Sequence, residues 1–177
     1  MAKPIRFILY FIFIMAFQVF ILNNIVIKSA LTLGDLPIFI PLIYPFIILI
    51  LPVNTNHVLV MLISFFVGLT MDMFSNTPGM HAATCVLLGY MRPYLLNLFF
   101  QQNIKDLGDT VPTLYRMGFK YFLLYNLFAL LVHHFFFYLL QIWSITNLIL
   151  IIFKTLVSLF LSIILIFLSQ LIFEKNQ

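Results

Sequence analysis

Long apolar runs separated by short polar segments constrain this chain more than any other feature. Hydrophobic residues make up 64% of the sequence and charged residues 8%, and the mean hydropathy is +1.15. A soluble globular protein needs more polar surface than this composition provides. The chain of 177 residues has room for about six spans of roughly 20 residues each. The sequence therefore predicts an integral membrane protein and excludes an enzyme domain outside the bilayer.

We expect one polytopic all-α membrane domain over residues 1–177, with six transmembrane helices. The apolar runs place the expected spans at residues 7–26, 36–51, 57–73, 78–99, 121–142 and 148–173. The second run is rich in proline, so we expect it to be kinked or locally unwound, with its freed carbonyls bonded by neighbouring helices. Arg92-Pro93 lies only about fourteen residues into the fourth run, which leaves the end of that span open. The polar residues 101–120 predict a loop with a short interfacial helix.

The basic residues are spread over the connections between the runs, and they predict the orientation of the chain. With six spans, both termini lie on one side of the membrane. That side would hold seven basic residues: Lys3, Arg6, Arg92, Lys105, Arg116, Lys120 and Lys175. Lys28 would lie on the other side, and Lys154 within the sixth span. Because basic loops stay in the cytoplasm, we expect cytoplasmic termini and no nucleic-acid partner, despite the net charge of +4.

Residues 68–81 (GLTMDMFSNTPGMH) set a carboxylate, a tight turn and a histidine between two long apolar runs. Asp72 has a hydrophobic segment on both sides, and a charge near lipid is rare unless it is paired, solvated or functional. Gly68 would lie on the same helical face and leave room for another helix to approach. The Thr-Pro-Gly sequence at 77–79 fits either a turn with proline second and glycine third, or a helix start with the threonine as its cap.

Asp72 and His81 could approach one another across this turn. A carboxylate beside an imidazole can serve proton transfer or a metal ion. No serine or cysteine nucleophile and no further histidine or acid accompanies them in the same loop, so we expect no catalytic, metal or cofactor-binding site. A hydrogen-bond network that ties the third and fourth spans together is favoured, and a contact with a partner is the alternative.

Several other polar side chains lie within the apolar runs. Lys154 is expected either to extend to the outer surface or to pair with Asp72. His133 and His134 are expected to be hydrogen-bonded in the core or to line an interface, rather than to act as ligands. Arg92 is expected to anchor the cytoplasmic side, with a cap on its span as the alternative.

A stripe of small, slightly polar residues follows one face of the sixth span. Its members recur at spacings of three, four and seven: Thr155, Ser158, Ser162 and Ser169. Such stripes are helix-packing faces in membranes. The pattern leaves open whether this face packs within the chain or against a helix of another protein.

The run 68–81, followed by an apolar span with Gly89 and Tyr90, resembles the signature of the rod shape-determining protein MreD family. That signature is a glycine, an acid four residues on, a turn rich in serine and asparagine, and a glycine that opens the next span. The matching positions here are Gly68, Asp72, Ser75 and Gly79, with His81 closing the run. The proline-rich second span and the six-span length match as well, whereas Pro78 stands where the family more often has an apolar residue.

The resemblance implies a non-enzymatic, multi-pass scaffold of the elongation machinery in the bacterial inner membrane, with no cofactor. Its partners would be the single-span protein MreC and, indirectly, the actin-like MreB, the glycosyltransferase RodA and a cell-wall transpeptidase. The resemblance also implies a fold similar to that of the substrate-binding subunits of energy-coupling-factor transporters. That likeness supplies the alternative function, a small-molecule (vitamin-like) binding subunit, which would need several convergent polar and aromatic side chains in an outward-facing pocket.

Overall fold

The computed structural model of the chain describes residues 3–24, 40–100, 110–143 and 145–173, and every regular element in these ranges is helical. The longer helices are α1 (Lys3–Phe20), α3 (His57–Ser75), α4 (Met80–Phe99), α6 (Phe119–Ile142) and α7 (Leu148–Phe173). Single helical turns form η1 (Leu22–Asn24), α2 (Phe46–Leu49), α5 (Leu114–Met117) and η3 (Ile145–Asn147).

Three described helices are long and apolar enough to cross a membrane: α3, α6 and the Leu148–Leu171 part of α7. The apolar stretch of the first helix with η1, Ile8–Asn24, is shorter. α4 has the length of these helices but not their apolar character, because it contains His81, Thr84 and Arg92. The described part of the chain therefore has the character of a helical membrane protein.

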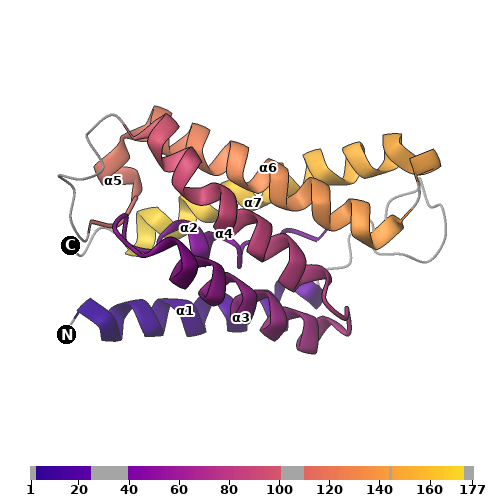
Figure 1. Cartoon of the computed structure of the whole chain (residues 1–177), viewed down its shortest axis with the longest axis horizontal. Helices are drawn as coiled ribbons and strands as arrows, with labels where there is room; N and C mark the ends of the chain where they lie inside the picture. Colours follow the sequence, from indigo (N-terminus) through magenta and orange to yellow (C-terminus); the bar gives the residue numbers. More distant parts are fainter. Residues whose placement is uncertain (1–2, 25–39, 101–109, 144, 174–177) are drawn as a thin grey trace.

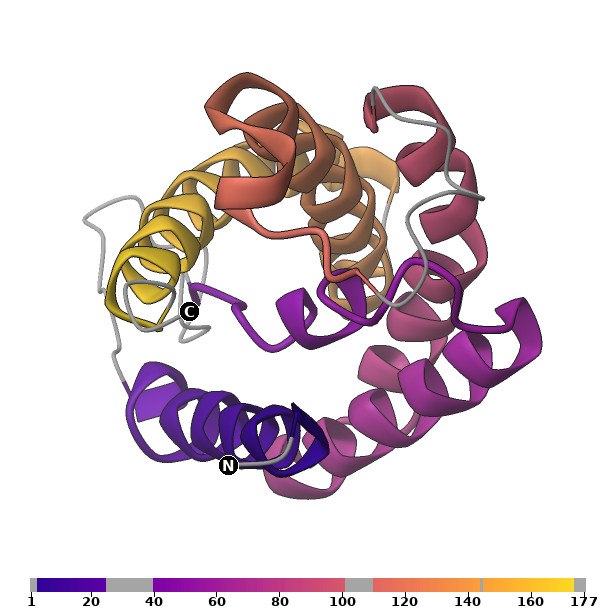
Figure 2. The ribbon, with the colours of Figure 1, turned by 90° about the vertical axis from the view of Figure 1, so that its left-hand side faces the viewer.

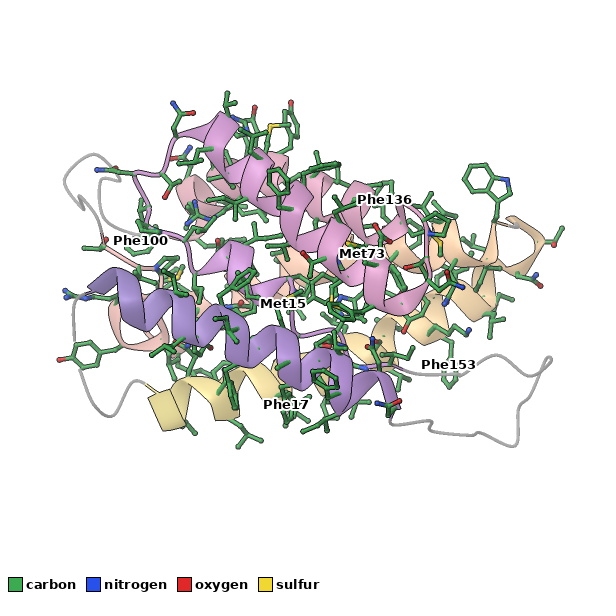
Figure 3. The ribbon with its side chains drawn as sticks, turned by 90° about the horizontal axis from the view of Figure 1, so that it is seen from below. Met15, Phe17, Met73, Phe100, Phe136 and Phe153 are labelled. Carbon is green, nitrogen blue, oxygen red and sulfur yellow. The ribbon has the colours of Figure 1, made fainter. Side chains whose placement is uncertain are left out.

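The helices stand around a central segment, residues 40–52, that runs through the middle of the bundle (Figure 2). α3 and α4 form one antiparallel pair, and α6 and α7 form another (Figure 1). α1 lies along the bundle with α3 on one side and α7 on the other (Figure 3). The start of α1, the short α5 and the end of α7 lie at one end of the bundle, here called the α5 end (Figure 1). The turn between α3 and α4 and the end of α6 lie at the opposite end, here called the turn end.

The central segment takes the place of the second expected span. α2 covers only four residues, and the rest of residues 40–52 forms no regular helix, while residues 36–39 lie outside the described ranges. Residues 41–51 are all buried. Local unwinding follows from Pro41 and Pro45, which lack the N–H group that a helix needs. Burial inside protein is also the condition under which non-helical backbone is tolerated at membrane depth.

α4 continues through its internal proline, Pro93, and ends at Phe99. Residues 94–99 thus belong to the same helix as Arg92, and this helix, whose end the sequence left open, ends at Phe99. A short helix, α5, follows in the polar stretch, of which residues 101–109 lie outside the described ranges. α6 then begins at Phe119, slightly before the expected start at residue 121.

Candidate functional site

Asp72 lies in the last turn of α3, and its buried carboxylate caps the first turn of α4. Oδ1 accepts a hydrogen bond from the backbone N–H of His81 at 2.9 Å and from the hydroxyl of Thr77 at 3.0 Å. Oδ2 accepts one from the backbone N–H of Ala82 at 2.9 Å. The first N–H groups of a helix lack partners within it, and its N-terminus favours negative charge. The carboxylate therefore joins α3 to α4 through the backbone.

The chain between the two helices forms a tight turn. The backbone N–H of Met80 donates to the carbonyl of Thr77 at 3.4 Å, and Gly79 adopts φ 81° and ψ −6°. With Pro78 second and a glycine of positive φ third, this is the geometry of a type II turn. Of the two arrangements that the sequence left open, the structure has the turn. The hydroxyl of Thr77 bonds Asp72 instead of capping α4.

Glycines allow α3 and α4 to approach closely at two levels. A Cβ atom placed on Gly68 would lie 2.5 Å from the Cα of Ala82 and 2.5 Å from the carbonyl oxygen of His81. A Cβ atom on Gly89 would lie 2.4 Å from Oγ of Ser64. Small residues that let backbones meet are typical of helix pairs in membranes. The packing of this pair therefore requires glycine at position 68, where backbone atoms stand in the way, and at position 89 a larger residue would have to displace the Ser64 hydroxyl.

Ser75, the last residue of α3, bonds η1, the helical turn that follows α1. Its Oγ accepts a hydrogen bond from Nδ2 of Asn23 at 3.2 Å. Asn76, directly after α3, adopts the left-handed conformation with φ 53° and ψ 43°, which asparagine tolerates better than most residues. The run 68–81 is thus a compact joint between helices, held by its own side chains and by η1.

The side chains of Asp72 and His81 do not meet as the sequence suggested they could, because the carboxylate bonds the backbone of His81. The imidazole points into the bundle, where Nδ1 lies 2.7 Å from the hydroxyl of Tyr44. The ring stacks on Phe137 of α6, with centroids 4.5 Å apart. The backbone of His81 therefore bonds α3, and its side chain contacts the central segment and α6.

Tyr44 also reaches His133 of α6, with 3.0 Å between the phenol oxygen and Nε2. Oγ1 of Thr84 lies 3.3 Å from the same nitrogen, and its proton is directed to a helix carbonyl, that of Met80 or His81, at 3.1 Å. Because the threonine oxygen then acts as an acceptor, we assign the imidazole proton of His133 to Nε2. Tyr44 in turn donates to His81. Nδ1 of His133 is buried without a hydrogen-bond partner in the described part of the chain.

A second group of polar side chains holds the first residues of the central segment. Gln18 of α1 donates through Nε2 to the carbonyl of Pro41 at 3.1 Å and accepts from the N–H of Ile43 at 2.8 Å. From α7, Oγ of Ser162 accepts from the N–H of Leu42 at 2.9 Å, and Ser158 donates to the carbonyl of Ile40. Neighbouring helices thus supply the bonds that the unwound backbone lacks.

The small-residue stripe of α7 faces this segment and α1. Thr155, Ser158 and Ser162 are buried. Ser162 also lies 3.1 Å from Nε2 of His134, whose Nδ1 lies 2.8 Å from the carbonyl of Leu130. Oγ of Ser169 lies 3.2 Å from the hydroxyl of Tyr10. Along these contacts the stripe packs within the chain.

The other end of the central segment is held by α4 and α6. Arg92 donates through Nη2 to the carbonyls of Leu51 and of Pro52, the latter at 3.3 Å, and the hydroxyl of Tyr125 donates to the carbonyl of Leu49 at 3.1 Å. Arg92 is only 1% exposed. The expectation of a cytoplasmic anchor was therefore wrong, because unwinding leaves carbonyls that a guanidinium can bond.

Lys154 is buried, and its Nζ lies 5.8 Å from the ring centroid of Tyr138 on α6. It neither extends to the outer surface nor pairs with Asp72, whose oxygens are taken up by the start of α4. A cation over an aromatic face is stabilised by the ring quadrupole. Tyr138 also donates to the carbonyl of Ile40 at 3.5 Å, so this contact borders the central segment.

Sequence reasoning missed three residues that hold the interior together: Gln18, Tyr44 and Thr84. Their signal was a polar atom inside an apolar run, but the pattern could not say what each would bond. The described ranges contain no group of three or more His, Cys, Asp or Glu side chains able to hold a metal ion. The arrangement can fix the positions of helices around an unwound segment. Comparison with models of protein families, with curated proteins and with solved structures finds no match for this chain.

Proposed function

We propose that the chain is a non-enzymatic membrane scaffold of the bacterial elongation (rod) machinery, which binds an MreC-like single-span partner and so supports cell shape and lateral peptidoglycan synthesis. The observation that carries this proposal is the run 68–81, whose residues match the MreD signature. Gly68, Asp72 and Gly79 of that run form the joint between α3 and α4. A firm joint suits a protein that presents its helices to a partner at a fixed angle.

The proposed topology has six passes: α1, the central segment, α3, α4, α6 and α7. Turn and helical hydrogen bonds link residues 43–51. At about 1.5–2.0 Å per residue there and about 3.3 Å per extended residue elsewhere, residues 40–52 reach roughly 30 Å, which is about the thickness of the hydrocarbon core. We place the α5 end in the cytoplasm, because most of the basic residues belong to that side. Six passes would agree with the fold that the resemblance to the MreD family implies, that of the substrate-binding subunits of energy-coupling-factor transporters.

Cysteine labelling tests the topology. Asn76 lies in the turn between α3 and α4, so a cysteine at this position is expected to react with an impermeant thiol reagent added outside the cell. Labelling of the Asn76→Cys variant only from the cytoplasmic side would show that the orientation is reversed. Cys85 is buried, and a Cys85→Ala background removes any contribution from it.

The partner must bind outward-facing surfaces of the helices. The Thr155–Ser158–Ser162 stripe, which the sequence left open as a contact for another protein's helix, is buried within the chain, and so are residues 41–51 of the proline-rich second run. Exposed apolar side chains lie instead along the outer faces of α1, α3 and α7, for example Ile12, Phe66 and Phe160. In lipid, a partner helix would associate with such a face through close packing and a few polar groups.

Copurification with site-specific crosslinking tests the function. Photoreactive residues at Ile12, Phe66 and Phe160 are introduced one at a time, and the crosslinked products from the native membrane are identified. The proposal expects an MreC-like single-span protein from at least one position, and an MreC-like reading frame beside the gene. Recovery of a transporter ATPase instead, with such an ATPase encoded nearby, would favour the vitamin-like binding subunit and contradict the scaffold.

A further inference from the structure

We propose that the α5–α6 junction, residues 114–120, is a binding surface for the headgroups of anionic phospholipids. Its contact residues are Tyr115, Arg116, Phe119 and Lys120. The inference does not depend on the scaffold function, since it follows from the exposure, position and charge of these side chains.

The α5–α6 junction turns two aromatic and two basic side chains outward. Tyr115 is 85% exposed and Phe119 65% exposed, and Arg116 and Lys120 are exposed as well. Met117 is buried against the core, so the inner face of the α5–α6 junction packs on the bundle. An amphipathic turn with aromatic and basic residues on its outer face is typical of a segment in the membrane interface.

The length of α6 places the α5–α6 junction at the level of the headgroups. Its 24 residues correspond to about 36 Å at about 1.5 Å per residue. That distance lies between the thickness of the hydrocarbon core, about 30 Å, and that of the bilayer with its headgroups, about 40–45 Å. The far end of the helix is followed by Trp143, which is 78% exposed. Exposed aromatic residues at both ends of one spanning helix match the aromatic belts of membrane proteins.

Charge then selects the class of lipid. Arg116 and Lys120 lie at the α5 end of the bundle, where α1 also starts, with Lys3 and Arg6 in its first turns (Figure 1). Within the described ranges the one acidic residue is Asp72, which lies at the turn end and caps α4. A guanidinium and an ammonium favour phosphate groups that carry a net negative charge over zwitterionic headgroups. Anionic phospholipid is therefore the occupant that this surface fits.

Competition between two lipids tests the proposal on the purified full chain. The protein in detergent is incubated with equimolar phosphatidylglycerol and phosphatidylcholine, and the retained lipid is extracted and quantified by mass spectrometry. The native chain is expected to enrich phosphatidylglycerol. Each basic residue near a membrane surface contributes about 1 kcal/mol, so R116Q and K120Q should each lower the enrichment about fivefold and together about thirtyfold.

The charge-conserving variant R116K/K120R is the matched control, and it should retain most of the enrichment. High salt should reduce the enrichment in the native chain, because exposed charges are screened. Circular dichroism verifies the helix content of every variant, and the two single variants serve as the test if the double variant does not fold. Equal enrichment in the native chain and in folded Gln variants would overturn the proposal. If R116K/K120R loses as much enrichment as the double Gln variant, the positive charge of these side chains does not cause the enrichment. That result would also overturn the proposal.

Discussion

Tyr44 and His81 meet through a 2.7 Å hydrogen bond between the phenol oxygen and the imidazole Nδ1. The backbone N–H of the same histidine donates to the carboxylate of Asp72. One residue thus links the joint between α3 and α4 with the central segment, through its backbone on one side and its side chain on the other. A displacement of the joint would be passed directly to the unwound segment.

Removal of the phenol oxygen should weaken this link. In Tyr44→Phe, the facing nitrogens of His81 and His133 lose a shared partner in a buried site. Such losses cost about 1–3 kcal/mol in proteins generally and commonly about 1 kcal/mol in membranes. We expect the free energy of unfolding in detergent to fall by about 1–2 kcal/mol. Tyr94→Phe, at an exposed tyrosine of α4, is the control, and equal stability of the two variants would contradict the importance of the link.

Substitutions of Asp72 should separate the role of its oxygens from that of its shape. Asp72→Asn keeps one acceptor oxygen for the start of α4, whereas Asp72→Leu keeps none and leaves the N–H groups of His81 and Ala82 without partners. We expect Leu to lower thermal stability and membrane accumulation clearly, and Asn to lower them less. If both variants match the native chain in protein level, partner recovery and cell shape, the carboxylate contributes nothing at the joint.

Gly68→Ala should be among the most damaging small changes in the chain. The added methyl group would meet backbone atoms of His81 and Ala82 at 2.5 Å, and backbone cannot rotate away as a side chain can. Overpacking of this kind costs typically about 1–3 kcal/mol. Thermal unfolding in detergent measures the loss.

Gly89→Ala offers the comparison, because its added methyl group would meet a side chain, Oγ of Ser64 at 2.4 Å. Combining it with Ser64→Ala should restore part of the lost stability. No change of Ser64 should rescue Gly68→Ala. A Gly68→Ala variant as stable as the native chain would show that α3 and α4 do not need their close contact.

The apolar runs made the long helices predictable, since α3 and α7 cover most of the ranges that the sequence indicated. Proline in the second run likewise predicted the loss of helix. The partners of the freed carbonyls could not be predicted, because Gln18, Ser158 and Arg92 lie far from the segment in sequence. Pairing across the bundle is a property of the folded chain, and apolar periodicity does not encode it.

Asp72 illustrates the same limit in the candidate site. Its position between apolar runs indicated a polar contact, and the glycine before it indicated a close helix. Whether the carboxylate would bond the imidazole of His81 or the backbone depended on the turn at Pro78 and Gly79, which admitted two geometries. The type II turn directs the first N–H groups of α4 at the carboxylate and turns the imidazole toward Tyr44.

Bulky substitutions in the small-residue stripe should unfold the bundle instead of only blocking a partner. Ser162 accepts from the backbone of Leu42 and contacts His134, so Ser162→Leu would displace the central segment. We expect a large loss of folded protein in detergent, seen as aggregation in size-exclusion chromatography. Phe160→Leu, on the exposed face of α7, should leave folding unchanged. Normal folding of Ser162→Leu would contradict the internal packing of the stripe.

Trp143 should report where the end of α6 lies in the bilayer. It is the only tryptophan of the chain, is 78% exposed, and follows the last turn of α6 in the left-handed conformation. In liposomes with brominated phospholipids, we expect its fluorescence to be quenched most by bromine near the headgroups. The matched variant Trp143→Asn/Phe136→Trp moves the probe about 10 Å along the same helix at about 1.5 Å per residue, to an outward position (Figure 3). Its quenching should shift to bromine deeper in the acyl chains. Equal depth profiles for the two probes, or no quenching of Trp143, would show that α6 does not cross the bilayer with this end at the interface.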